Sequence, residues 1–133
     1  MEFTNVSKTG TGDSYVQWPK AIQIALTNTP ITPKQACVFV AFLQRTTGQD
    51  FRQCKINFAN GKPGRNSWGI AYTRENIIAL YRHDTMTFLH ELAHLDPKTH
   101  RPGRMHGPAF GRTLDGFIVQ WLSATWQEVL KAL

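Results

Sequence analysis

The chain has 133 residues, of which 41% are hydrophobic, and a formal net charge of +6 at pH 7. This length favours one domain with an apolar core, which we expect at residues 14–133, after a flexible tail at residues 1–13. The sequence has no run of about 18 apolar residues, which excludes a membrane-spanning helix, and its polar start lacks the hydrophobic region of a signal peptide. The sequence therefore predicts a cytoplasmic protein.

A helix is predicted to begin at Thr32. The Thr32 side chain can cap it, Pro33 suits its first turn, and Gln35 completes a capping box. Apolar residues then recur at helical spacing, and the helix should end near Thr46, before Gly48. Such a stripe is typical of a helix that packs on a hydrophobic core.

Three short strands are expected after this helix. Residues 54–58 alternate between apolar and polar side chains, and the segments 68–73 and 77–82 are separated by a turn that suits a hairpin. The hairpin leads directly into a second helix, which Asp84 or Thr85 can cap. The strands predict a small antiparallel or mixed sheet next to this helix.

The second helix carries the most informative feature of the chain. His90, Glu91 and His94 form an HExxH motif, and all five histidines lie within residues 83–106. Residues four apart on a helix share a face, so the two imidazoles can bind one metal ion. Glu91 then lies close enough to act on a water bound to that ion. The motif predicts a zinc-dependent hydrolase.

A catalytic zinc site usually has three protein ligands, so a third ligand is expected. His106 is the first choice, because Pro108 suits the start of a third helix and would place His106 just before it. His100 has the spacing of a metzincin ligand, but Pro97 stands where metzincins have a glycine. A site with two histidines and the carboxylate of Asp115 is the third option.

The HExxH motif, the loop after it and the segment His106-Gly107-Pro108-Ala109-Phe110 together resemble a known pattern. It is the HExxH…HGPxF pattern of small zincin-like metallohydrolases, which occur in actinobacteria and their phages and are related to the SprT/Spartan group. The resemblance covers residues 32–123. It implies an α+β, zincin-like fold, in which a small sheet packs on the HExxH helix and a long C-terminal helix.

Carried over residue by residue, the resemblance implies Zn²⁺ bound by His90, His94 and His106. Glu91 is then the general base for a zinc-bound water in a metallopeptidase, and the substrate is a protein or peptide. In zincins the sheet edge beside the active site pairs with an extended substrate. Either strand of the predicted hairpin could take that role.

Supporting residues around the metal are also expected, although the sequence does not rank them. A carboxylate often orients a metal-binding imidazole, and the candidates are Asp84, Asp96 and Asp115. A hydrogen-bond donor or cation can stabilise the oxyanion of the reaction, and the candidates are Tyr72, Arg104 and Arg112.

Basic residues cluster on both sides of the motif. Residues 51–74 and 97–114 contain nine lysines and arginines and no acidic residue. Such clustering indicates either weak binding of nucleic acid or another acidic partner, or a solvated surface that keeps the protein in solution. No known nucleic-acid-binding motif accompanies it.

Two other functions fit the same residues. The chain could be a non-catalytic binding protein that keeps zinc for folding, in which case Glu91 has no task. A fourth protein ligand such as His100 would favour this, because structural zinc sites are closed. It could also be a nucleic-acid-binding module whose zinc is incidental. The sequence identifies neither the substrate nor the oligomeric state.

Overall fold

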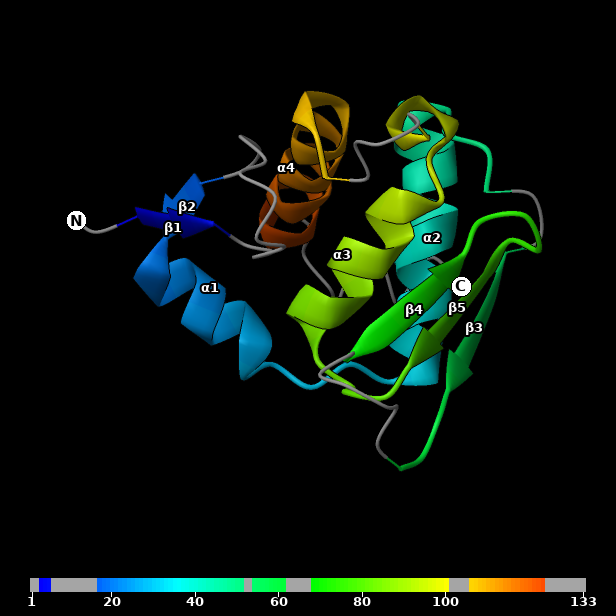
Figure 1. The fold of residues 1–133 in the computed structure, drawn as a ribbon, viewed down its shortest axis with the longest axis horizontal. Helices are drawn as coiled ribbons and strands as arrows, with labels where there is room; N and C mark the ends of the chain where they lie inside the picture. Colours follow the sequence, from blue (N-terminus) through cyan, green and yellow to red (C-terminus); the bar gives the residue numbers. More distant parts are fainter. Residues whose placement is uncertain (1–2, 6–16, 52–53, 62–67, 101–105, 124–133) are drawn as a thin grey trace.

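The computed structural model describes residues 3–5, 17–51, 54–61, 68–100 and 106–123, and the following account concerns these residues (Figure 1). They form an α+β arrangement of four α-helices, a three-stranded mixed sheet and a two-stranded antiparallel sheet. The predicted fold class is therefore confirmed at this level. Within the described ranges, no helix has both the length and the apolar character needed to cross a membrane.

The first described elements are two short paired strands and a helix. Strand β1 (Phe3–Asn5) pairs antiparallel with β2 (Gln17–Pro19), which leads into α1 (Lys20–Thr27). Most of the tail expected at residues 1–13 lies outside the described residues. The described part of that segment is a strand.

Helix α2 (Pro33–Thr47) begins and ends where its local signals predict. The Thr32 hydroxyl accepts the N–H of Gln35 at 3.1 Å, and the Gln35 side chain accepts the N–H of Thr32 at 3.0 Å. Gly48 then ends the helix with a φ of 72°, a left-handed conformation that favours glycine. The predicted capping box and end are confirmed.

The three-stranded sheet has β5 (Ile77–Leu80) at its centre. Strand β3 (Lys55–Phe58) pairs with β5 in parallel, and β4 (Gly69–Tyr72) pairs with β5 antiparallel through a tight turn. Asn76 in this turn has a φ of 60°, which asparagine tolerates better than most residues. The predicted hairpin is confirmed, and the sheet is mixed.

Helix α3 (Thr85–His94) carries the HExxH motif and lies between the sheet and α4 (Pro108–Ser123) (Figure 1). Asp84 caps α3, because its carboxylate accepts the N–H of Thr87 at 2.8 Å. The apolar side chains of α3 that are completely buried are Phe88, Leu89, Leu92 and Ala93. Burial of a large apolar side chain contributes about 1.5–3 kcal/mol, so packing holds this short helix in place.

Helix α4 is the long helix predicted after His106, and its apolar stripe completes the core. The buried side chains of this stripe are Phe110, Leu114, Phe117, Ile118 and Trp121. Trp121 meets Phe39 of α2 edge to face, with 5.1 Å between the ring centroids. Because α4 is fixed in this way, the position of the residue just before it is fixed as well.

Candidate metal centre

Helix α3 and the start of α4 bring three imidazoles together. His90 and His94 lie one turn apart on α3, and His106 stands two residues before α4. The Nε2 atom of His106 lies 3.0 Å from that of His94 and 3.3 Å from that of His90. The Nε2 atoms of His90 and His94 are 3.3 Å apart. The three nitrogens therefore converge on one point.

This convergence has the dimensions of a metal site. Two nitrogens that bind a tetrahedral ion at about 2.0–2.1 Å lie about 3.3 Å from each other. Among the described residues, the group whose donor atoms could share one ion consists of His90, His94 and His106. The structure thus brings together the three histidines that the sequence singles out, and they could hold a metal ion.

Burial keeps the imidazoles of His90 and His94 neutral, which is the state that binds a metal. Burial, followed by the nearby His94 and His106, lowers the pKa of His90 well below its ordinary value. Burial, followed by His106 and His100, lowers the pKa of His94 to about 3. At neutral pH His90 and His94 therefore present nitrogen lone pairs instead of positive charges.

Phe110 forms an apolar wall against all three imidazoles. Its ring centroid lies 4.5 Å from that of His94, 4.8 Å from that of His106 and 5.0 Å from that of His90. The sequence places Phe110 in the HGPAF segment and in the α4 stripe, but neither pattern indicates this contact. The role becomes visible only when α3 and α4 are packed together.

Glu91 lies beside the cluster and is buried. One carboxylate oxygen is 4.0 Å from Nε2 of His90, and the residue is 7% exposed. Burial raises the pKa of Glu91 to about 7, because the negative charge loses its hydration. A carboxyl group with such a pKa can exchange protons near neutral pH, as a general base requires.

His100, the alternative third ligand, lies outside the cluster. Its Nε2 donates a hydrogen bond to the backbone oxygen of His94 at 2.7 Å. The hydroxyl of Thr99 lies 2.8 Å from the backbone oxygen of Asp96 and 3.2 and 3.3 Å from those of Ala93 and His94. Both residues satisfy carbonyls at the end of α3, where a helix lacks internal partners. Here His100 caps the motif helix.

The three aspartates considered as supporting residues have other surroundings. Asp84 caps α3 and pairs with the Arg82 guanidinium at 2.8 Å. Asp96 accepts the side-chain amide of Gln49 at 2.8 Å. Asp115, also the alternative carboxylate ligand, is exposed on α4 and lies outside the histidine cluster. The hydrogen bonds of Asp84 and Asp96 fix the two ends of α3.

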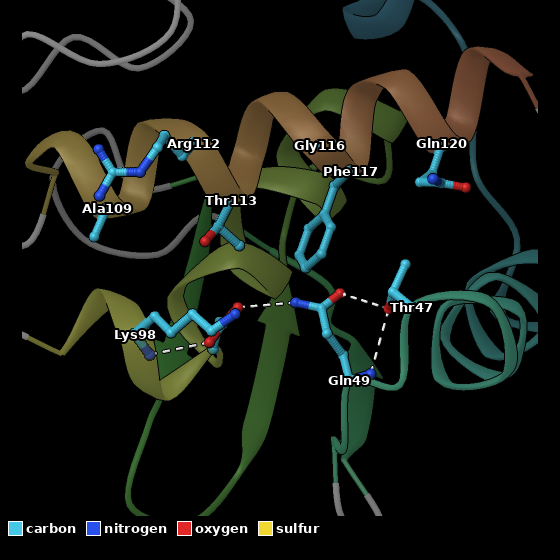
Figure 2. A pocket seen from close by; sticks show the side chains of 10 residues that line it. Thr47, Gln49, Lys98, Ala109, Arg112, Thr113, Gly116, Phe117 and Gln120 are labelled. Carbon is cyan, nitrogen blue, oxygen red and sulfur yellow. Dashed lines mark hydrogen bonds between the residues drawn. The ribbon is translucent and has the colours of Figure 1, made fainter.

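The contact between Gln49 and Asp96 lies in a cavity of about 310 Å³, and Figure 2 shows the side chains that line this cavity. The cavity lies between the end of α2, the turn after α3, and α4, and none of the three clustered histidines lines it. Arg112, one of the oxyanion candidates, lines this cavity, while Tyr72 is exposed at the end of β4. The third candidate, Arg104, lies outside the described residues.

The basic stretches are only partly described. The described cations of these stretches are all exposed, and they are Lys55, Arg74, Lys98 and Arg112. The remaining cations lie outside the described residues, and they are Arg52, Lys62, Arg65, Arg101 and Arg104. Exposure fits either interpretation of the basic clusters.

Comparisons of the chain with protein-family models, with curated proteins and with solved structures found no match. The chemistry of the site is therefore argued from its residues and their geometry.

Proposed function

We propose that this chain is a zincin-like, zinc-dependent hydrolase whose substrates are proteins or peptides. The observation that carries the proposal is the convergence of three imidazoles, whose Nε2 atoms lie 3.0–3.3 Å from one another, next to the buried carboxyl group of Glu91. A structural zinc site is usually closed by a fourth protein ligand, whereas a catalytic site leaves that position open. Three clustered histidines match the open kind.

Zinc is the metal that best suits this set of donors. Imidazole nitrogens also suit copper, iron and nickel, but three histidines with tetrahedral spacing are typical of catalytic zinc. When bound, Zn²⁺ supplies a Lewis acid that polarises a carbonyl and lowers the pKa of a water molecule. The Phe110 ring packs against all three imidazoles, which restricts their movement.

Glu91 provides the proton transfers that hydrolysis of an amide requires. Its carboxylate accepts a proton from the attacking water, and the new carboxyl group gives that proton to the nitrogen of the leaving amine. The raised pKa of Glu91, about 7, suits both steps, since the group binds and releases a proton near neutral pH.

Strand β4 offers a place for an extended peptide. The backbone oxygen of Leu80 accepts the N–H of Ala59 at 2.8 Å, on the β3 side of the sheet. Alternate residues of a strand direct their N–H and C=O groups to the same side, so these groups of Leu80 and Ile78 face β3 and point away from β4. Their partners Gly69 and Ala71 direct N–H and C=O to the outer edge of β4. Strand β5 is paired on both sides, so of the hairpin strands β4 is the one that can bind a peptide.

Peptide cleavage by the zinc-loaded chain, compared with a Glu91→Gln variant, tests the proposal. An unfolded protein and a peptide library serve as substrates, and mass spectrometry identifies the products. Glutamine preserves the size of the side chain, so the variant should keep its fold and metal while cleavage falls about 10²–10⁴-fold. Absence of cleavage by the wild type, or equal cleavage rates for the two proteins, would contradict the proposed function.

A further inference from the structure

Gly69, the first residue of β4, lies against the side chain of Glu91. A Cβ atom on Gly69 would lie 2.8 Å from Cγ of Glu91, 3.2 Å from its Oε2 and 3.1 Å from Cγ2 of Thr87. Nonbonded carbon atoms normally stay about 3.5–4.0 Å apart. The side chains of Glu91 and Thr87 therefore occupy the space that a side chain at position 69 would need.

The Glu91 side chain has little room to move away from a Cβ atom at position 69. The closest atom, Cγ, is in the middle of the side chain, so rotation of the carboxyl group alone would not relieve the contact. Thr87 lies one helical turn before Glu91 and is itself held, because its hydroxyl donates to Asp84 at 3.0 Å and its N–H donates to Asp84 at 2.8 Å. Glu91 is thus confined between Thr87 and the backbone of β4.

Strand β4 is fixed at the same point. The backbone oxygen of Trp68 accepts the N–H groups of Tyr81 and Arg82, both at 2.9 Å. The Arg82 guanidinium lies 5.2 Å from the centroid of the Trp68 ring, and its Nε lies 2.8 Å from the carboxylate of Asp84. Arg82 thereby connects the start of β4 to the cap of α3, which keeps the strand close to Glu91.

We propose that Gly69 is a positioning residue for Glu91. Without a side chain, Gly69 lets β4 hold the carboxyl group 4.0 Å from Nε2 of His90. A methyl group at this position displaces the carboxyl group and leaves the three imidazoles in place. The consequence for the rate rests on the proposed function, because it requires Glu91 to be the base. The contact between Gly69 and Glu91 does not depend on that function.

The kinetic test compares Gly69→Ala with Gly116→Ala. Gly116 is exposed on α4, and a Cβ there meets no atom within 4 Å, so this variant is the matched control. A displacement of about 1 Å can cost about 10²-fold in rate. We expect Gly69→Ala to lose kcat by about that factor with full zinc content, and Gly116→Ala to match the wild type. In the Glu91→Gln background, Gly69→Ala should cause no further loss. An equal loss in both backgrounds would overturn the proposal.

A stability cycle tests the contact without any measurement of activity. Glu91→Ala removes Cγ, so Gly69→Ala should lower the melting temperature much less in that background than in the wild type. If Gly69→Ala alone does not fold, the double variant should fold. Equal losses in both backgrounds would show that Gly69 does not act on Glu91. If the wild type cleaves no substrate, the proposed function fails, and this cycle still shows whether position 69 is coupled to Glu91.

Discussion

The ring of Phe110 lies against the imidazole of His94, with a centroid distance of 4.5 Å and an interplanar angle of 29°. Phe110 is 1% exposed, and it also meets His90 and His106 edge to face. The same side chain thus joins the core of α4 to each member of the histidine cluster. Core packing and metal binding should therefore be coupled at this residue.

Replacement of Phe110 by alanine should weaken both properties. The cavity left by a buried phenylalanine costs about 3–5 kcal/mol, and the imidazoles lose the wall that holds them. Phe110→Leu fills more of the space and should lose less. Urea unfolding and competition with a chelator measure the two effects, and Val119→Ala on the exposed side of α4 is the control. Wild-type metal affinity in Phe110→Ala would show that the ring does not support the site.

Local signals in the sequence were sufficient to predict α2 and the start of α3. Thr32, Gln35 and Gly48 determine the ends of α2 through contacts within a few residues, and Asp84 does the same for α3. The position of His106 before α4 also follows from a local signal, since Pro108 suits the first turn. These features could be predicted because neighbouring residues decide them.

Features that depend on distant segments could not be predicted. The parallel pairing of β3 with β5 joins residues separated by the whole hairpin, and no local pattern specifies it. The sequence also gives no sign that Gly69 touches Glu91, since a glycine at the start of a strand has many possible causes. The sequence does not indicate the capping role of His100, because the spacing of His100 from His94 resembles that of a ligand.

The stability of the metal-free protein should fall as the pH drops below about 6.5. Burial lowers the pKa of His90 and His94 from 6.5, so the unfolded chain binds protons that the folded chain does not, and acid favours unfolding. Burial raises the pKa of Glu91 from 4.5 to about 7. The stability that its protonated carboxyl group contributes is therefore lost as the pH rises from 4.5 to about 7. Between about pH 4.5 and 6.5 the two imidazoles lower the free energy of unfolding as acid is added, and the carboxyl group raises it. Because there are two imidazoles and one carboxyl group, the net effect of acid should be a loss of stability.

Urea unfolding in the presence of a chelator, repeated across this pH range, measures that dependence. Glu91→Gln removes the opposing contribution, so its free energy of unfolding should decline more steeply with acid than that of the wild type. A profile that is flat for both proteins would mean that the imidazoles titrate normally and are not buried as described.

The basic stretches should bind polyanions weakly and without sequence preference. Four of their cations are described and exposed, and they are Lys55, Arg74, Lys98 and Arg112. Binding through phosphate contacts weakens linearly in a plot of log affinity against log salt. Titration of single-stranded and duplex DNA at two salt concentrations measures this. No binding at low salt would leave the charge as a feature of the solvated surface.

The metal content of two histidine variants tests the central claim most directly. The purified chain should hold about one zinc ion, because three imidazoles converge on a single point. His106→Ala removes one of these nitrogens and should lose most of the metal, whereas His100→Ala removes only a cap of α3 and should keep it. Elemental analysis of the wild type and both variants, with circular dichroism to verify folding, gives the result. Full zinc content in a folded His106→Ala, together with loss in His100→Ala, would contradict the site described.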